Sequence, residues 1–126
     1  MKRHEIRKKL VFAVYQHMLL KIDLNSTLVD VFDVEDITSI DEYALELAKS
    51  ININQQNFIE EISKHLKRWT FDRLNYLDQA ILLVGAAELK AAKVQKAIII
   101  DEAISIAKEY CDDDAYKYIN GVLDRL

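Results

Sequence analysis

Five of the first nine residues are lysine or arginine, and they form the part of the chain best suited to bind an anion. Arg3 and Arg7 are four residues apart, so they share one face of a helix, with Lys2 and Lys8 beside them. The first turn of a helix also offers free backbone N–H groups to phosphates. The pattern therefore predicts a phosphate-binding site at the start of the chain. The alternative is a solvated basic terminus that binds nothing.

Signals for catalysis are weak throughout the chain. His4, His17 and His65 are far apart, and none forms a His-x3-His or Glu-x-x-His metal pair. Cys111 precedes three aspartates, which raise the pKa of a thiol rather than lower it. Two isolated glycines cannot build a Gly-rich phosphate loop. We therefore expect a binding or scaffold protein that is not an enzyme and uses no metal or cofactor.

The chain carries a net charge of −4 that is unevenly distributed. Residues 1–20 have a net charge of +4 and residues 21–48 one of −7, whereas residues 49–96 carry +3 and residues 97–126 carry −4. A basic segment on an acidic body indicates a local anionic partner. The acidic segment could attract a basic protein partner, and we expect it to speed their association from a distance.

The elements that must position the basic segment are all helical. The sequence has no proline and two glycines, which is unlike hairpins or sandwiches. Residues 80–87 are apolar on every side of a helical wheel, so the stretch 72–89 must be surrounded by other helices or by lipid. It is shorter than the about 20 apolar residues that a membrane span needs. We predict an all-α, compact bundle around this buried central helix, as one domain over residues 1–126.

The cellular compartment follows from two further features. The single cysteine excludes an internal disulfide and fits a reducing environment. The first residues lack the apolar run of a secretory signal. These features predict a cytoplasmic protein that does not bind membranes.

Apolar residues at helical spacing predict the helices that wrap the centre. The first covers 5–21, and a short one covers 27–36 with Asn25 or Ser26 as its N-cap. The next begins near Tyr43 and either ends near Ile53 or continues through Leu66. One more contains residues 100–110, and the last begins at residue 115 after an aspartate N-cap. Six or seven helices result.

Three residues carry specific structural expectations. Gly85, followed by two alanines, should let a neighbouring helix approach the central one closely. Trp69 is expected to anchor the core or its edge rather than to bind a ligand. Apolar residues continue beyond Asn120, so we expect the last helix to pass through Gly121, which would allow close packing there.

Three segments in order give the chain a resemblance to the NusB family of transcription antitermination proteins. The first is Arg3-x3-Arg7 followed by Ala13-Val14-Tyr15, similar to the family's arginine-rich first helix and its Val-Tyr or Leu-Tyr pair. The second is Asp72-Arg73-Leu74-x3-Asp78-x-Ala80-Ile81-Leu82 with Ala87-Glu88-Leu89. The most specific is Ile100-Asp101-Glu102-Ala103, Ala107-Lys108 and Tyr118-Ile119-Asn120-Gly121-Val122-Leu123-Asp124. Residues 22–65 carry little of the resemblance.

The resemblance implies two packed helical subdomains and a function. NusB proteins bind boxA RNA of ribosomal RNA transcripts together with the ribosomal small-subunit protein that acts as Nus factor E, within an RNA polymerase antitermination complex. Carried over residue by residue, the resemblance implies an RNA-binding set consisting of Lys2, Arg3, Arg7, Lys8, Tyr15, Asp114 and Tyr118. Tyr118 occupies a position where the family usually has Phe, and a tyrosine there can still stack on a base.

The sequence departs from the family pattern at several positions. His4 and Glu5 stand where the family is often basic, and Leu83 stands where it commonly has arginine. Two other classes are therefore kept. One is a helical protein–protein adaptor without specific RNA binding, and the other is the RNA-binding domain of a ribosomal RNA cytosine methyltransferase, which lacks support because no Rossmann-type domain follows. The sequence leaves self-association as a homodimer open.

Overall fold

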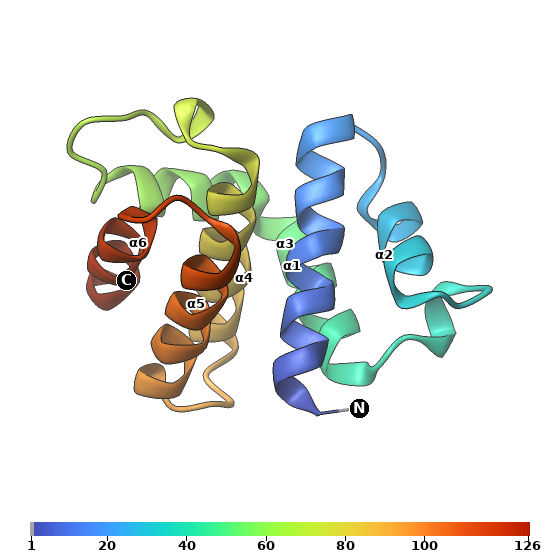
Figure 1. Ribbon diagram of the computed structural model, residues 1–126. Helices are drawn as coiled ribbons and strands as arrows, with labels where there is room; N and C mark the ends of the chain where they lie inside the picture. Colours follow the sequence, from blue (N-terminus) through green and yellow to red (C-terminus); the bar gives the residue numbers. More distant parts are fainter. Residues whose placement is uncertain (1) are drawn as a thin grey trace.

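The computed structural model describes residues 2–126, and Figure 1 shows them as a group of helices joined by turns and two longer connections. Six α-helices and two short 3-10 helices are present, with no strand among the described residues, which confirms the all-α prediction. No helix in this part of the chain is long and apolar enough to cross a membrane. In chain order the elements are α1 (Arg3–Leu20), α2 (Leu24–Phe32), η1 (Ile37–Ser39), α3 (Glu42–Ser63), η2 (Phe71–Arg73), α4 (Tyr76–Ala91), α5 (Lys96–Tyr110) and α6 (Ala115–Arg125).

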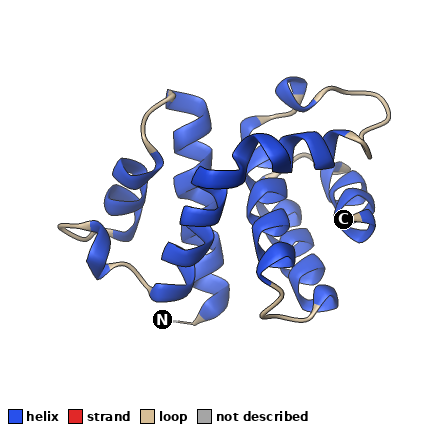
Figure 2. Ribbon diagram, turned by 180° about the vertical axis from the view of Figure 1, so that it is seen from behind, coloured by secondary structure: helices blue, strands red, loops and turns tan. Residues whose placement is uncertain are grey.

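The helices form two groups that share α3 and α4. Helix α1 packs against α2 and α4, whereas α5 packs against α6 and α4. In the view from behind in Figure 2, α3 crosses in front of both groups, and Figure 1 shows α2 at one edge of the molecule and α6 at the other. The chain therefore places α1 and α5 side by side across α4, and the candidate site lies along this seam.

Helix α4 is the buried central helix that the apolar pattern predicts. Every residue from Asp78 to Glu88 is buried, and α1, α3, α5 and α6 all contact the helix. A Cβ atom placed on Gly85 would lie 2.8 Å from Leu123 Cδ2, so the missing side chain lets α6 approach α4 closely. The expected close packing at Gly85 is confirmed.

Gly121 does not have the packing role expected of it. The last helix passes through Asn120 and Gly121 as predicted. A Cβ atom at Gly121, however, would meet nothing within 4 Å. Gly121 faces open space because the buried stripe of α6 consists of Ala115, Ile119, Val122 and Leu123. Close approach to α4 uses Gly85 instead.

The short second helix begins earlier than predicted. Helix α2 starts at Leu24 after Asp23, so Asn25 and Ser26 lie inside the first turn and are not the N-cap. Leu24 is completely buried, and the Thr27 hydroxyl donates a hydrogen bond of 2.8 Å to the Ala13 carbonyl of α1. Packing on α1 therefore sets the start of the helix, and cap chemistry does not.

The long third helix is continuous, which decides between the two alternatives that the sequence leaves open. Helix α3 runs through Asn52 and Asn54 and ends at Ser63. The Asp41 side chain accepts a 3.0 Å hydrogen bond from the Ala44 backbone N–H and caps its start. Helix α6 likewise begins after Asp114, but the Asp114 side chain makes no capping hydrogen bond.

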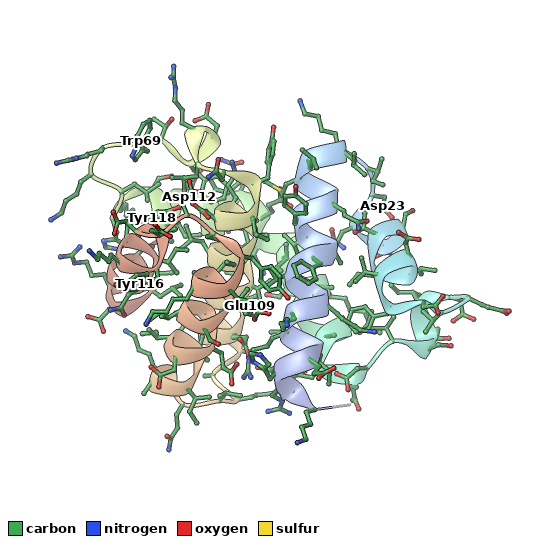
Figure 3. All side chains as sticks on the ribbon, viewed as in Figure 1. Asp23, Trp69, Glu109, Asp112, Tyr116 and Tyr118 are labelled. Carbon is green, nitrogen blue, oxygen red and sulfur yellow. The ribbon has the colours of Figure 1, made fainter. Side chains whose placement is uncertain are left out.

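Trp69 does not anchor the core. Its side chain is 59% exposed, on the non-helical segment between α3 and η2. The neighbouring Phe71 is buried and takes the anchoring role expected of the tryptophan. This leaves a large aromatic ring on the surface beside α6 (Figure 3).

Candidate nucleic-acid interface

The two predicted contact residues at the start of α1 are exposed. Lys2 is the N-cap residue of α1, and Arg3 lies in its first turn. The guanidinium carbon of Arg3 lies 4.2 Å from the centroid of the Tyr43 ring. This cation–π contact orients Arg3 but leaves its N–H donors accessible. Both cations can reach a phosphate from this position.

Arg7 is placed quite differently, although it shares a helical face with Arg3. Its side chain is buried, with the residue 4% exposed. The Arg7 Nε donates to both carboxylate oxygens of Glu88 at 2.9 Å, and the Tyr43 hydroxyl donates to Glu88 Oε1 at 2.5 Å. Arg7 Nη1 lies 4.0 Å from Glu102 Oε1, and Arg7 Nη2 has no hydrogen-bond partner among the described residues. Arg7 therefore joins α1 to α3 and α4 from inside, and a direct phosphate contact does not fit this placement.

The protonation states around Arg7 follow from burial and pairing. Burial lowers the pKa of Arg7, but the hydrogen bond and charge of Glu88 outweigh it, so the net pKa is raised. Burial and the bond to Glu88 both raise the pKa of Tyr43. Arg7 therefore stays a charged guanidinium and Tyr43 a neutral phenol at every ordinary pH.

Lys8 lies in the middle of the seam between α1 and α5. Its Nζ is 3.3 Å from Glu109 Oε1 and 5.2 Å from the Tyr110 ring centroid. Figure 3 labels Glu109 at this seam. The Phe12 ring meets Tyr110 edge-on with centroids 5.1 Å apart. Lys8 is thus partly neutralised by its own neighbours before any ligand arrives.

Tyr15 and Tyr118 lie near the other end of the seam, in two neighbouring hollows. Tyr15 lines a hollow of about 330 Å³ next to Tyr110 and Cys111. Tyr118 lines a second of about 540 Å³, and both hollows share Asn75, Asp78 and Asp112. We name the second one the Asp112 hollow. The tyrosines of the predicted RNA-binding set are therefore brought to one end, away from Lys2 and Arg3.

Asp78 connects the two hollows. It is 5% exposed, and the Tyr118 hydroxyl donates a hydrogen bond to its Oδ2. Its other oxygen, Oδ1, has no hydrogen-bond partner within residues 2–126. Burial, followed by the bond to Asp78, raises the pKa of Tyr118. Burial, followed by the hydrogen bond and charge of Asp78 and the charge of Asp112, raises the pKa of Cys111. The Cys111 thiol therefore stays protonated.

Asp114, the last member of the predicted set, is exposed and pairs with Lys117, the two charged atoms lying 3.3 Å apart.

Sequence reasoning missed Tyr43, Glu88 and Tyr110, which hold the cations of α1. Glu88 gave a signal, because a carboxylate on the buried stripe of a central helix needs a hydrogen-bond donor or a cation beside it. Residues 2–126 contain no group of three histidine, cysteine, aspartate or glutamate side chains that could hold a metal ion.

Comparison with known proteins places this arrangement in a family. The model of the NusB family matches residues 4–126. The chain belongs to the NusB family. The transcription antitermination protein NusB of Wolinella succinogenes is 31% identical over 98% of this chain and 93% of its own. That of Campylobacter lari is 36% identical over 98% and 94% of the two chains.

Solved NusB structures share the whole fold. T. maritima NusB superposes with a TM-score of 0.85 at 30% identity, covering 99% of this chain and 89% of its own. The chain is also similar to one in a crystal structure of the antitermination factors NusB and NusE in complex with dsRNA. That match has a TM-score of 0.80 at 25% identity and covers 98% of this chain and 96% of that one.

Proposed function

We propose that this chain is a transcription antitermination factor that binds boxA-type RNA together with NusE, the ribosomal protein acting as Nus factor E. It would act in the cytoplasm within an RNA polymerase elongation complex and carry out no catalysis. The similarity to a chain in the NusB–NusE–dsRNA complex, which extends over nearly the full length of both, carries the proposal. The exposed cations of α1 and the half-buried tyrosines at the other end of the seam support it.

Each side chain of the predicted set receives a role from its surroundings. Lys2 and Arg3 contact phosphates, because they are exposed and Arg3 is already oriented by Tyr43. Lys8 adds a weaker contact, since Glu109 shares its charge. Tyr15 and Tyr118 offer ring faces to unstacked bases.

Arg7 and Asp114 act indirectly in this proposal. Arg7 is a positioning residue that holds α1 on α4 through Glu88, so that Arg3 faces solvent. Asp114 pairs with Lys117 at the start of α6, the helix that carries Tyr118.

A protein partner is needed because the cationic surface along α1 is small. Two or three phosphate contacts bind RNA weakly and lose affinity steeply with added salt. The −7 segment, residues 21–48, would attract a basic partner. Exposed apolar side chains at the end of α1, Leu19, Leu20 and Ile22, give such a partner a surface to cover.

Those exposed apolar residues also favour the second candidate, a helical adaptor that binds proteins but no specific RNA. A hollow of about 810 Å³ lies beside them, lined by Met18, Ile22, Ile59 and Phe71 among others. The same surface could pair with a second copy of the chain, so self-association stays a prediction. Sedimentation of the free protein measures it.

The deciding experiment is fluorescence anisotropy of a labelled boxA-type RNA, titrated with this protein alone and with NusE, against a scrambled RNA. We expect tighter, sequence-dependent binding when NusE is present. Arg3→Ala should weaken it and reduce the salt dependence by about one phosphate contact. Lys49→Ala, on an exposed position of α3, is the matched control. Equal binding of both RNAs in the presence of NusE would favour the adaptor.

A further inference from the structure

A fourth hollow lies on the side of Tyr118 that faces away from the α1–α5 seam, between the segment 64–74 and α6. It measures about 400 Å³. We name it the Trp69 hollow, and its lining residues are His65, Leu66, Lys67, Arg68, Trp69, Leu74, Lys117, Tyr118, Gly121, Val122 and Arg125. None of the residues of the predicted RNA-binding set apart from Tyr118 belongs to it.

The Trp69 hollow is cationic on an acidic protein. Lys67, Arg68, Lys117 and Arg125 line it, and no aspartate or glutamate does, although the whole chain has a net charge of −4. Lys67, Arg68 and Arg125 are exposed and form no ion pair with residues 2–126. Unpaired cations around a concave surface raise the local concentration of anions. The occupant is therefore expected to carry negative charge.

The aromatic ring makes the chemistry of that occupant more specific. Trp69 is 59% exposed and sits among the cations, on a segment that forms no helix. An acidic peptide would use the lysines and arginines but has no need of an exposed indole. Flat aromatic faces beside a basic groove are the arrangement that proteins use to stack bases of single-stranded nucleic acid.

The Trp69 hollow is continuous with the proposed RNA path. Trp69, Leu74 and Tyr118 line both this hollow and the Asp112 hollow. The Asp112 hollow contains Asp78 and Asp112, together with Asp113 and Asp114, against Arg73 as its one cation. Figure 3 shows Trp69, Asp112 and Tyr118 at the same end of the molecule. A strand that reaches Tyr118 is therefore repelled from one side of the ring and attracted to the other.

We propose that the Trp69 hollow is a second RNA subsite, which takes a nucleotide flanking the boxA-type element. Its base stacks on Trp69, and its phosphates contact Lys67 and Arg68 on one side and Lys117 and Arg125 on the other. The inference rests on the proposed function and adds the direction in which the strand leaves Tyr118. It also accounts for the exposure of Trp69, which core packing does not explain.

The sequence has one tryptophan, so its intrinsic fluorescence reports on this hollow directly. The test compares a boxA-type RNA with the same RNA lengthened by a few uridines at either end, each titrated into the complex of this protein with NusE. The fluorescence stays specific to Trp69 when the NusE used has no tryptophan, or when the fluorescence of NusE alone is subtracted. We expect the lengthened RNA to quench Trp69 and to bind at least about fivefold more tightly than the short one.

Two variants separate the subsite from a structural effect. Trp69→Ala should remove the advantage of the lengthened RNA and leave the affinity for the short RNA unchanged. Lys67→Gln with Arg68→Gln should reduce the same advantage and its salt dependence. The control is Lys49→Gln with Lys93→Gln, which removes two charges outside the Trp69 hollow. Circular dichroism checks that every variant keeps its helices.

Three outcomes would overturn the subsite. Equal affinity for short and lengthened RNA, without quenching, removes it while the proposed function stands. Quenching by NusE alone assigns the hollow to the protein partner. Failure of both RNAs to bind in the presence of NusE removes the proposed function and this inference with it.

Discussion

Helix α4 carries two buried carboxylates, Asp78 and Glu88, and each accepts a hydrogen bond from a tyrosine hydroxyl of another helix. Glu88 is also paired with Arg7 through two hydrogen bonds of 2.9 Å. Asp78 has no cation partner, and its Oδ1 accepts no hydrogen bond among the described residues. Both ends of α4 thus pair a carboxylate with a tyrosine hydroxyl, but only the Glu88 end adds a cation.

The difference lies in what each carboxylate faces. Glu88 is enclosed by α1, α3 and α4, and its hydrogen bonds are complete, so it joins helices and binds nothing else. Asp78 lines two hollows at the end of the seam, where Tyr15 and Tyr118 lie. Its Oδ2 accepts the hydrogen bond of Tyr118, whereas its Oδ1 is buried and has no hydrogen-bond partner among the described residues. The Arg7 end therefore joins helices, whereas the Tyr118 end lines the hollows in which we propose that RNA binds.

The largest expected effect concerns Arg7. Arg7→Ala leaves the Glu88 charge buried without its cation, which should lower the free energy of unfolding by about 3–5 kcal/mol. Arg3→Ala, on the same helical face, should cost about 0.5–1 kcal/mol because its contact with Tyr43 is exposed. Urea denaturation followed by circular dichroism measures both.

A double variant makes the Arg7 comparison stricter. Arg7→Met with Glu88→Leu removes both charges and should recover most of the loss, because two apolar side chains of similar volume can replace a buried pair. Equal losses for Arg7→Ala and Arg3→Ala would mean that the ion pair does not join the helices.

Substitutions at the two glycines test how α6 packs on α4 and so places Tyr118 next to Asp78. Gly85→Ala forces Leu123 to move, since the new methyl would lie 2.8 Å from its Cδ2, and should cost about 1 kcal/mol net of the gain in helix propensity. Gly121→Ala adds a methyl in open space and should stabilise the protein by about 1 kcal/mol. Thermal unfolding of both variants measures the difference, and a reversed order would contradict the packing of α6 on α4.

Asp78→Asn should change stability little. The amide oxygen can still accept the Tyr118 hydrogen bond, and the variant removes a buried charge that has no cation. We expect a change within about 1 kcal/mol, against about 3 kcal/mol lost in Glu88→Gln, where Arg7 loses its counter-charge. Denaturant midpoints of the two variants provide the comparison. A large loss in Asp78→Asn would show that Asp78 has a structural partner comparable to Arg7.

The last prediction concerns the dependence of stability on alkaline pH. Burial, then a carboxylate, raises the pKa of both Tyr43 and Tyr118, so the fold favours their protonated forms. This stability is fully present below the ordinary tyrosine pKa of about 10 and falls as pH rises above it, because the unfolded chain loses these protons first. Unfolding at increasing alkaline pH should show the fall, and Tyr43→Phe or Tyr118→Phe should each reduce it. A fall of unchanged size in both variants would assign it to other groups.

Much of the fold was predictable because it depends on local patterns. The all-apolar stretch 80–87 predicted a central helix, and spacing predicted the helices around it. The start of α2 was wrong because packing of Leu24 and Thr27 on α1 outweighs the cap preference of Asn25 and Ser26. The role of Gly121 was wrong because only the rotation of α6 decides which glycine meets a neighbour.

The candidate site was less predictable than the fold. Helical spacing places Arg3 and Arg7 on one face but does not say that the face turns inward after one turn. Leu83, which stands where the family commonly has arginine, is completely buried in α4 and therefore has no surface to offer RNA. The exposure of Trp69 left no trace in the sequence, since a tryptophan between two helices is more often an anchor than a binding platform.

The sequence by itself determined the helical class, the family and the uneven distribution of charge, because composition, spacing and motifs are properties of neighbours along the chain. Only the tertiary structure decided which charges are available to a ligand. Arg7 meets Glu88 across 81 positions, and Tyr118 meets Asp78 across 40. Such pairings depend on how helices rotate and stack, and the burial that results decides whether a charge joins helices or faces a partner.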